Sequence, residues 1–313
     1  MDRTWDCIVV GAGAAGLSAG LVLGRARRRA LVVDAGRQSN RHTDGIGGLL
    51  ANDRRPPLDF YANGHAELAS YPTVELRSGE VLSGRRHEEG FVLELADGST
   101  EAAQRVLLAT GMEYRYPPLD GIKERWGRSV FHCPFCHGWE HRDQPLGVLD
   151  RGGALMLTAW SDDVTLLTDG PADLTSEDRG RLEAAGVAID ERSIAGLRGP
   201  DGTLTAVAFT GGGERPCGGL LVPVTLHQRS ALAAQLGAAT TEPGPLFGDA
   251  LAVDAKFATS VPGLFAAGDA GGLMPSVANA VASGNTAAAM VVMSLMTAPR
   301  ALAASAAGPG ATR

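Results

Sequence analysis

Two cysteines and a histidine stand close together in the middle of the chain, in the string FHCPFCHGWE over residues 131–140. Cys133 and Cys136, separated by two residues, can exchange two electrons by opening and closing one disulfide. A neighbouring histidine lowers the pKa of a thiol and can carry its proton. The spacing therefore indicates thiol–disulfide exchange, with His137 as the first choice for the acid–base group and His132 as the second.

A glycine-rich turn, GAGAAG over residues 11–16, lies near the start of the chain. An apolar run over 6–10 precedes it, a helical pattern over 14–23 follows it, and a second apolar run over 30–33 ends at Asp34. This order of strand, turn, helix, strand and acid predicts a dinucleotide-binding βαβ unit. The helix N-terminus would hold a pyrophosphate and the acid would bind a ribose. A bound dinucleotide cofactor could accept or supply the electrons of the cysteine pair.

Length and composition bound the class of protein. The 313 residues, 44% hydrophobic and with 42 glycines, suggest a globular α/β chain of two domains. A net charge of −7 with mixed signs argues against non-specific nucleic-acid binding. The sequence shows neither a secretory segment nor an apolar run of about 18 residues, so we expect a cytoplasmic protein that does not enter a membrane.

Further apolar runs complete the predicted elements of the first domain. Short strands are expected over 73–76, 79–83, 91–95 and 105–109, and the proline pair at 117–118 marks a plausible hinge. Near the end of the chain, an apolar strand closes on Gly268-Asp269, and an alanine-rich helix is expected from 277 to about 296.

The middle of the chain repeats the βαβ pattern. A strand is expected over 146–149, a helix over 154–160 and a second strand over 164–168, and Gly244-Pro245 marks the return. The predicted fold is therefore α/β with two Rossmann-like domains. A discontinuous first domain would comprise residues 1–117 and 244–313, and an inserted domain, residues 118–243, would carry the two cysteines.

Three separated segments, 11–16 with Asp34, 109–111, and 263–269 with the following helix, resemble the FAD-binding domain of flavoprotein disulfide reductases. Because the cysteine pair lies in the inserted domain, nearly the whole chain resembles the low-molecular-weight thioredoxin reductases. The resemblance implies FAD as cofactor and a homodimer. It implies cofactor-binding roles for the pyrophosphate turn (Gly11, Gly13, Ala14, Ala15, Gly16), the adenosine site (Asp34, Ala35, Val81), the strand end (Ala109, Thr110, Gly111), the ribityl site (Gly268, Asp269) and the flavin edge (Val277, Ala278).

The inserted domain departs from a working NADPH site. Asp150 stands where such a site has the first glycine of its phosphate turn, which places a carboxylate against the phosphates. Asp169 follows the next predicted strand, and no arginine pair follows it to bind a 2′-phosphate. The nucleotide motif therefore looks degraded, although Asp169 could still accept an NADH ribose.

A dithiol that does not receive electrons from a pyridine nucleotide can receive them from a substrate. The motif from Cys133 to Glu140 is similar to that of dithiol oxidases that close disulfides in natural products such as gliotoxin and holomycin. The resemblance implies an FAD-dependent dithiol oxidase acting on a small-molecule dithiol, with oxygen as electron acceptor. By analogy, Cys133 would face the substrate and Cys136 the flavin.

Other interpretations of the cysteine pair remain open. One is a pyridine-nucleotide-dependent reductase of a thioredoxin-like protein, and another is a flavin-binding redox sensor. The pattern Cys-x-x-Cys-His also matches covalent haem attachment, which fits poorly beside a flavin domain. We expect no metal site, because Cys7 and Cys217 lie far away in the sequence and no second Cys-x-x-Cys pair accompanies the first.

Overall fold

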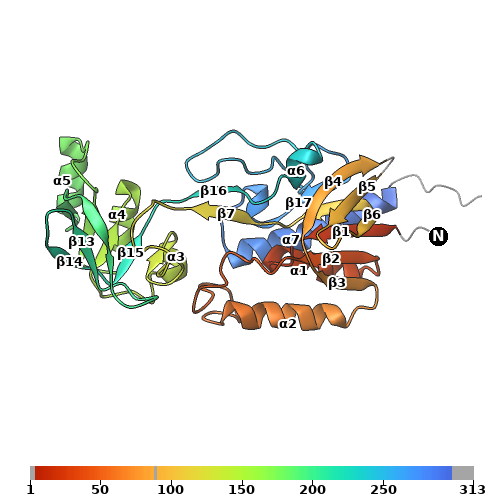
Figure 1. The fold of residues 1–313 in the computed structure, drawn as a ribbon, viewed down its shortest axis with the longest axis horizontal. Helices are drawn as coiled ribbons and strands as arrows, with labels where there is room; N and C mark the ends of the chain where they lie inside the picture. Colours follow the sequence, from red (N-terminus) through yellow and green to blue (C-terminus); the bar gives the residue numbers. More distant parts are fainter. Residues whose placement is uncertain (1–3, 88–89, 298–313) are drawn as a thin grey trace, which may run out of the picture.

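The computed structural model describes residues 4–87 and 90–297 as two lobes joined by a two-stranded ribbon (Figure 1). A seven-stranded sheet in the order β3-β2-β1-β6-β5-β4, with β17 beside β6, forms the first lobe. Its strands are β1 (Trp5–Val10), β2 (Ala30–Asp34), β3 (Val74–Ser78), β4 (Val81–His87), β5 (Gly90–Leu95), β6 (Thr100–Leu108) and β17 (Leu264–Ala266). Strands β1, β2, β3, β6 and β17 run parallel, so their carboxyl ends meet at one edge.

Two helices rich in small residues cover one face of this sheet. They are α1 (Ala14–Arg25) and α7 (Val277–Thr297). A side chain at Gly284 of α7 would lie 2.0 Å from the carbonyl oxygen of Ala15, so only glycine allows this close approach. Helix α2 (Pro57–Ala69), which the sequence pattern did not predict, packs on the outside of α1. The glycine turn before α1 is therefore held rigidly at the sheet edge.

Helix α7 is long and apolar enough, by length and composition, to cross a membrane. The prediction that no segment reaches this length was therefore wrong. Ala287, Ala288, Val291 and Val292 nevertheless lie buried against the first lobe. One face of α7 therefore packs in the core of that lobe.

The second lobe has a five-stranded parallel sheet in the order β11-β10-β9-β15-β8 and a small antiparallel sheet, β12-β13-β14. The strands are β8 (Val130–Phe131), β9 (Leu146–Val148), β10 (Val164–Leu167), β11 (Ala188–Asp190), β12 (Ile194–Arg198), β13 (Ala206–Phe209), β14 (Glu214–Pro216) and β15 (Gly219–Leu221). The helices are α3 (Pro134–His137), α4 (Arg151–Leu157) and α5 (Ser176–Ala184). The predicted α/β fold class, with a Rossmann-like unit in each lobe, is confirmed.

The ribbon between the lobes consists of β7 (Met112–Arg115) and β16 (Thr225–Gln228), paired antiparallel (Figure 1). After β16, helix α6 (Leu232–Gln235) lies against β4, and Leu232 and Leu236 are buried in the core of the first lobe beside Leu93. The chain therefore re-enters the first lobe at the ribbon, earlier than the boundary at residue 244 that the glycine and proline there suggested. Buried leucines, rather than turn residues, set this boundary.

Candidate functional site

One pocket runs from the sheet edge of the first lobe to the cysteine pair of the second. It is lined by most of the residues predicted to bind the cofactor: Gly11, Gly13, Ala14, Ala15, Asp34, Ala35, Val81, Ala109, Thr110, Gly111, Gly268, Asp269 and Val277. Cys136 and His137 line its far end. Gly16, Ala278 and Cys133 are not among the lining residues. The fold thus brings segments more than 100 residues apart in the sequence around one cavity.

The glycine turn of the first lobe forms an open cradle. Gly11 has a φ of +106°, and a side chain there would lie 2.3 Å from the carbonyl oxygen of Ala109. A side chain at Gly16 would lie 1.8 Å from the carbonyl oxygen of Gly11, so Gly16 serves packing rather than lining. At Gly13 the nearest heavy atom to an added Cβ is Gln38 Cγ, 3.9 Å away, and no side chain caps α1. The helix amides there remain available to a pyrophosphate.

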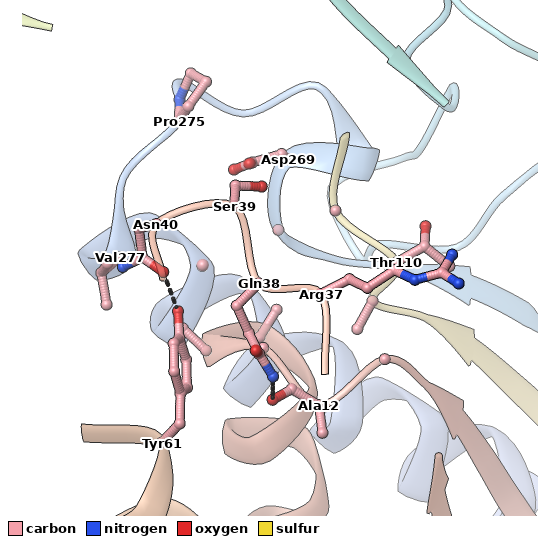
Figure 2. Close-up of a pocket in the computed structure, with 18 of the residues that line it drawn as sticks. Ala12, Arg37, Gln38, Ser39, Asn40, Tyr61, Thr110, Asp269, Pro275 and Val277 are labelled. Atoms are coloured by element: carbon pink, nitrogen blue, oxygen red, sulfur yellow. Dashed lines mark hydrogen bonds between the residues drawn. The ribbon is translucent and has the colours of Figure 1, made fainter. Parts of the chain in front are cut away.

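Asp34, the acid predicted to bind a ribose, is held in place by its own neighbours. Asp34 Oδ1 accepts hydrogen bonds from the backbone amide of Gly36 at 2.8 Å and from Gln38 Nε2 at 3.2 Å. Its Oδ2 lies 3.3 Å from His65 Nε2. Gln38 also donates to the carbonyl oxygen of Ala12, which ties the acid to the glycine turn (Figure 2). Sequence reasoning missed Gln38 and His65.

Two tyrosines that carried no sequence signal also line the pocket. Tyr114 donates a hydrogen bond to Asp269 Oδ2 at 2.9 Å. Burial raises the pKa of the Asp269 carboxyl, and it also raises the pKa of the Tyr114 hydroxyl. Tyr61 donates to Asn40 Oδ1 at 2.6 Å (Figure 2), and burial raises the pKa of Tyr61 to about 12. Both tyrosines are therefore protonated hydrogen-bond donors at neutral pH.

The two cysteines lie at the start of α3. Cys133 caps this helix, and its Sγ lies 2.7 Å from Cys136 Sγ, close enough for the atoms to bond after a small side-chain rotation. The hydrogen bond from the Cys136 thiol, helped by backbone amides of the helix, lowers the pKa of Cys133 to about 7. The same hydrogen bond and burial raise the pKa of Cys136. Cys133 is thus the more acidic thiol of the pair, and Cys136 is the cysteine that lines the pocket.

One of the two ring nitrogens of His137 has no hydrogen-bond partner. Its Nε2 lies 3.2 Å from the carbonyl oxygen of Gly127, which can only accept, so Nε2 carries the proton. Nδ1 is buried and has no hydrogen-bond partner. The ring stacks on Phe131 with 5.5 Å between centroids and 11° between planes. Burial lowers the pKa of His137, so the ring is neutral at pH 7 and Nδ1 can accept a proton.

The alternative histidine, His132, has a different setting. Its ring stacks with Trp126 at 5.8 Å and lies 4.9 Å from the ring of Tyr114. Burial lowers its pKa to about 4. His132 is thus an aromatic spacer of the pocket wall, and His137 is the better placed base.

The comparisons with known proteins agree with this geometry. A model of the pyridine nucleotide-disulphide oxidoreductase family matches residues 5–284. The chain belongs to this family. The thioredoxin reductase tcpT of Claviceps purpurea is 32% identical over 307 residues, covering 93% of this chain and 94% of the relative.

Solved structures support the same assignment. An oxidoreductase from Agrobacterium tumefaciens matches with a TM-score of 0.89 and 32% identity, over 95% of this chain and 100% of its own. The structure of HlmI matches with a TM-score of 0.88 and 34% identity, over 95% of this chain and 94% of its own. The predicted family, the FAD cofactor and the class of oxidoreductase are thereby confirmed, and the open cradle at Gly13 fits the FAD pyrophosphate.

This pyridine nucleotide-disulphide oxidoreductase has a second glycine turn, before α4 of the second lobe. Asp150 caps α4, and its Oδ2 accepts a hydrogen bond from the backbone amide of Gly153 at 3.2 Å. The carboxylate thus occupies the helix end where a nucleotide phosphate would bind. Asp169 Oδ1 accepts a hydrogen bond from the backbone amide of Ile194 at 2.6 Å, so this oxygen is already used at the end of β10.

Proposed function

We propose that the protein is an FAD-dependent dithiol oxidase. It would close a disulfide in a small-molecule dithiol through Cys133 and Cys136, with oxygen as the final electron acceptor. One contrast carries the proposal. The dithiol and His137 adjoin the FAD pocket, whereas Asp150 fills the helix end that a pyridine nucleotide would need. Electrons would therefore enter from the dithiol side.

The residues of the chain supply the exchange chemistry. His137 Nδ1 would take the proton of the incoming substrate thiol, and the resulting thiolate attacks Cys133 Sγ of the Cys133–Cys136 disulfide. The bond between the cysteines breaks, Cys136 leaves as a thiolate, and a mixed disulfide forms. The second substrate thiol gives its proton to the Cys136 thiolate, whose pKa is raised, attacks the substrate sulfur and releases Cys133 as a thiolate. A lowered pKa makes Cys133 a good leaving group, and two electrons and two protons have passed to the enzyme.

The first lobe would hold the cofactor that these electrons reach. The cradle at Gly13, the acid Asp34 and the buried Asp269 would bind its pyrophosphate, ribose and ribityl groups. When bound there, FAD supplies a two-electron acceptor for the Cys133–Cys136 dithiol. Tyr114 holds Asp269 at 2.9 Å, which fixes the position of the carboxylate in the pocket.

An anaerobic reduction experiment tests this proposal. Purified yellow protein is mixed separately with dithiothreitol, NADPH and NADH, and the flavin absorbance is followed. We expect bleaching by dithiothreitol alone, with recovery and peroxide formation on admitting air. Prompt bleaching by NADPH or NADH would overturn the proposal in favour of a thioredoxin reductase, as the names of the relatives suggest. A reaction that stops after one equivalent of dithiol in air would indicate a redox sensor.

A further inference from the structure

The only exposed Phe, Trp or Tyr side chains among the described residues lie within and just after the cysteine pair. All eight Phe, four Trp and four Tyr residues lie within the described parts of the chain, and only Phe135 and Trp139 are exposed. Phe135 is 74% exposed and Trp139 is 56% exposed. Scattered apolar residues on a surface need no explanation, but two large rings beside a reactive group indicate a contact surface.

Phe135 lies in α3, and Trp139 lies in the turn that directly follows this helix. They are four residues apart, and the amide of Gly138 bonds to the carbonyl of Pro134 at 2.7 Å, so the turn extends beyond α3. Cys136, between them in the sequence, faces the FAD pocket. Cys133 is half-buried and does not line that pocket, so the part of its side chain that is exposed is open to a substrate.

Neighbouring side chains fix the orientation of both rings. Phe135 packs edge-on against Trp160, with 5.4 Å between centroids and 81° between planes. Trp160 itself presses against the backbone, because a side chain at Gly138 would lie 2.9 Å from its ring. The guanidinium of Arg142 lies 4.2 Å from the centre of the Trp139 ring. Each ring therefore has a neighbouring side chain that favours one orientation before any ligand arrives.

The charges around the two rings are already paired within the chain. Arg142 lies 3.9 Å from Asp143, and Glu140 lies 3.8 Å from Arg54 of the first lobe. The surface therefore offers flat apolar rings and no unpaired charge among these residues. A neutral partner fits it better than an acidic or basic peptide does.

On the basis of the proposed function, we propose that Phe135 and Trp139 form a recognition platform for the substrate, a small, uncharged dithiol carrying a flat apolar ring. Stacking on the platform would place one substrate thiol at Cys133, while Cys136 stays turned to the pocket. The rings determine specificity and take no part in the electron transfer.

Two dithiol probes of equal chemistry test the platform. Both 1,2-bis(mercaptomethyl)benzene and dithiothreitol close a six-membered cyclic disulfide, but only the first carries a flat ring. Anaerobic stopped-flow bleaching of the flavin gives an apparent Kd and a limiting rate for each. We expect the wild-type protein to bind the ring-bearing probe about tenfold more tightly, as aromatic contacts of this kind provide. Phe135→Leu and Trp139→Ala should each remove most of this preference with little change in limiting rate.

Matched variants separate the platform from its alternatives. Trp139→Phe should keep the preference, and so should Met156→Ala, which removes another exposed apolar side chain of the same lobe. Equal affinity for both probes in the wild-type protein, or an unchanged preference in both platform variants, would overturn the platform but leave the proposed function intact. Failure of both probes to bleach the flavin would overturn the proposed function itself. A platform variant that changes the oligomeric state, or slows only a thioredoxin, would assign the rings to a protein partner instead.

Discussion

The two lobes each place a glycine turn between a parallel strand and a helix, and the two turns end differently. In the first lobe, Gly13 leaves the N-terminus of α1 without a side-chain cap and open to a ligand. In the second lobe, Asp150 caps α4 through the amide of Gly153. The same backbone arrangement can thus bind an anion or satisfy itself, and one side chain decides which.

The difference also shows where redox chemistry lies in this molecule. The second lobe keeps the parallel sheet of a nucleotide-binding unit, but its contribution to the pocket comes from the β8 end and α3. Strand β8 pairs with β15 through Val130 and Phe131, and the chain then turns directly into the cysteine pair. The lobe therefore acts as a holder for the dithiol.

The largest effect should come from removing either cysteine of the Cys133–Cys136 pair. Cys133→Ser and Cys136→Ser should each lower dithiol turnover by at least about a thousandfold, because a serine oxygen cannot form the disulfide. Both variants should stay yellow, since neither side chain is part of the cradle of the first lobe. Turnover is measured as oxygen consumption with dithiothreitol.

A third cysteine provides the matched control. Cys217 is buried in the second lobe, and burial raises its pKa to about 12. Cys217→Ala should keep full turnover. Wild-type turnover in Cys133→Ser or Cys136→Ser would contradict the assignment of the exchange chemistry to this pair.

The next largest effect should come from removing the proposed base, His137. His137→Gln should lower the limiting rate about a hundredfold, in the range usual for a lost acid–base group. Because burial lowers the pKa of His137, the neutral base should persist below pH 6.5, and the wild-type rate should fall only as the pH drops through that lowered pKa. In the variant this fall of the rate at low pH, the acid limb of the pH profile, should disappear. The rate of the variant should keep rising as the pH approaches the pKa of the substrate thiol.

His141 distinguishes the role of the base from that of the aromatic stack. Its ring lies on Phe131 at 5.5 Å, like that of His137, but it does not line the pocket. His141→Gln should retain the acid limb. Loss of the limb in this variant, or its survival in His137→Gln, would assign the base elsewhere.

The sequence predicted the parts of the fold that local pattern controls. Strand β1, the glycine turn, α1 and β2 follow from apolar runs and glycines within about 30 residues of one another. Helix α2 escaped prediction because only Pro57, Tyr61 and Leu68 of its residues are buried. Its place is set by contacts with α1, where Gly20 leaves room for Leu68.

The candidate site also contains residues that local sequence patterns predict and residues that they do not predict. The cysteine pair, His137 and the glycine cradle have motif spacings that can be recognised in one sequence. Tyr114 comes from the ribbon and Gly47 from a loop whose backbone presses on Cys136, and neither belongs to a motif. Their roles depend on how the lobes meet, which no local spacing encodes.

A carboxylate placed at the glycine turn of the first lobe, as Asp150 is placed in the second lobe, should weaken FAD binding. Gly13→Asp would place a negative charge at the N-terminus of α1, beside the expected FAD pyrophosphate, and we expect FAD affinity to fall by more than about tenfold. Gly13→Ala is the steric control, because it adds a Cβ at the same position, 3.9 Å from the nearest protein atom, without adding a charge. Affinity is measured by titrating apoprotein with FAD. Equal affinities for the two variants would show that charge at this turn has no influence on the cofactor.

The smallest effect should come from the second turn itself. Asp150→Ala removes the helix cap, which should cost about 1 kcal/mol of stability and lower the melting temperature by a few degrees. Asp150→Asn keeps an acceptor for the Gly153 amide and should melt close to the wild type. Dithiol turnover should not change in either variant, since Asp150 does not line the FAD pocket. Flavin reduction by NADPH in Asp150→Ala, and not in the wild type, would show that this one carboxylate keeps the nucleotide out. No reduction in either would mean that the missing basic residues after β10 exclude it as well.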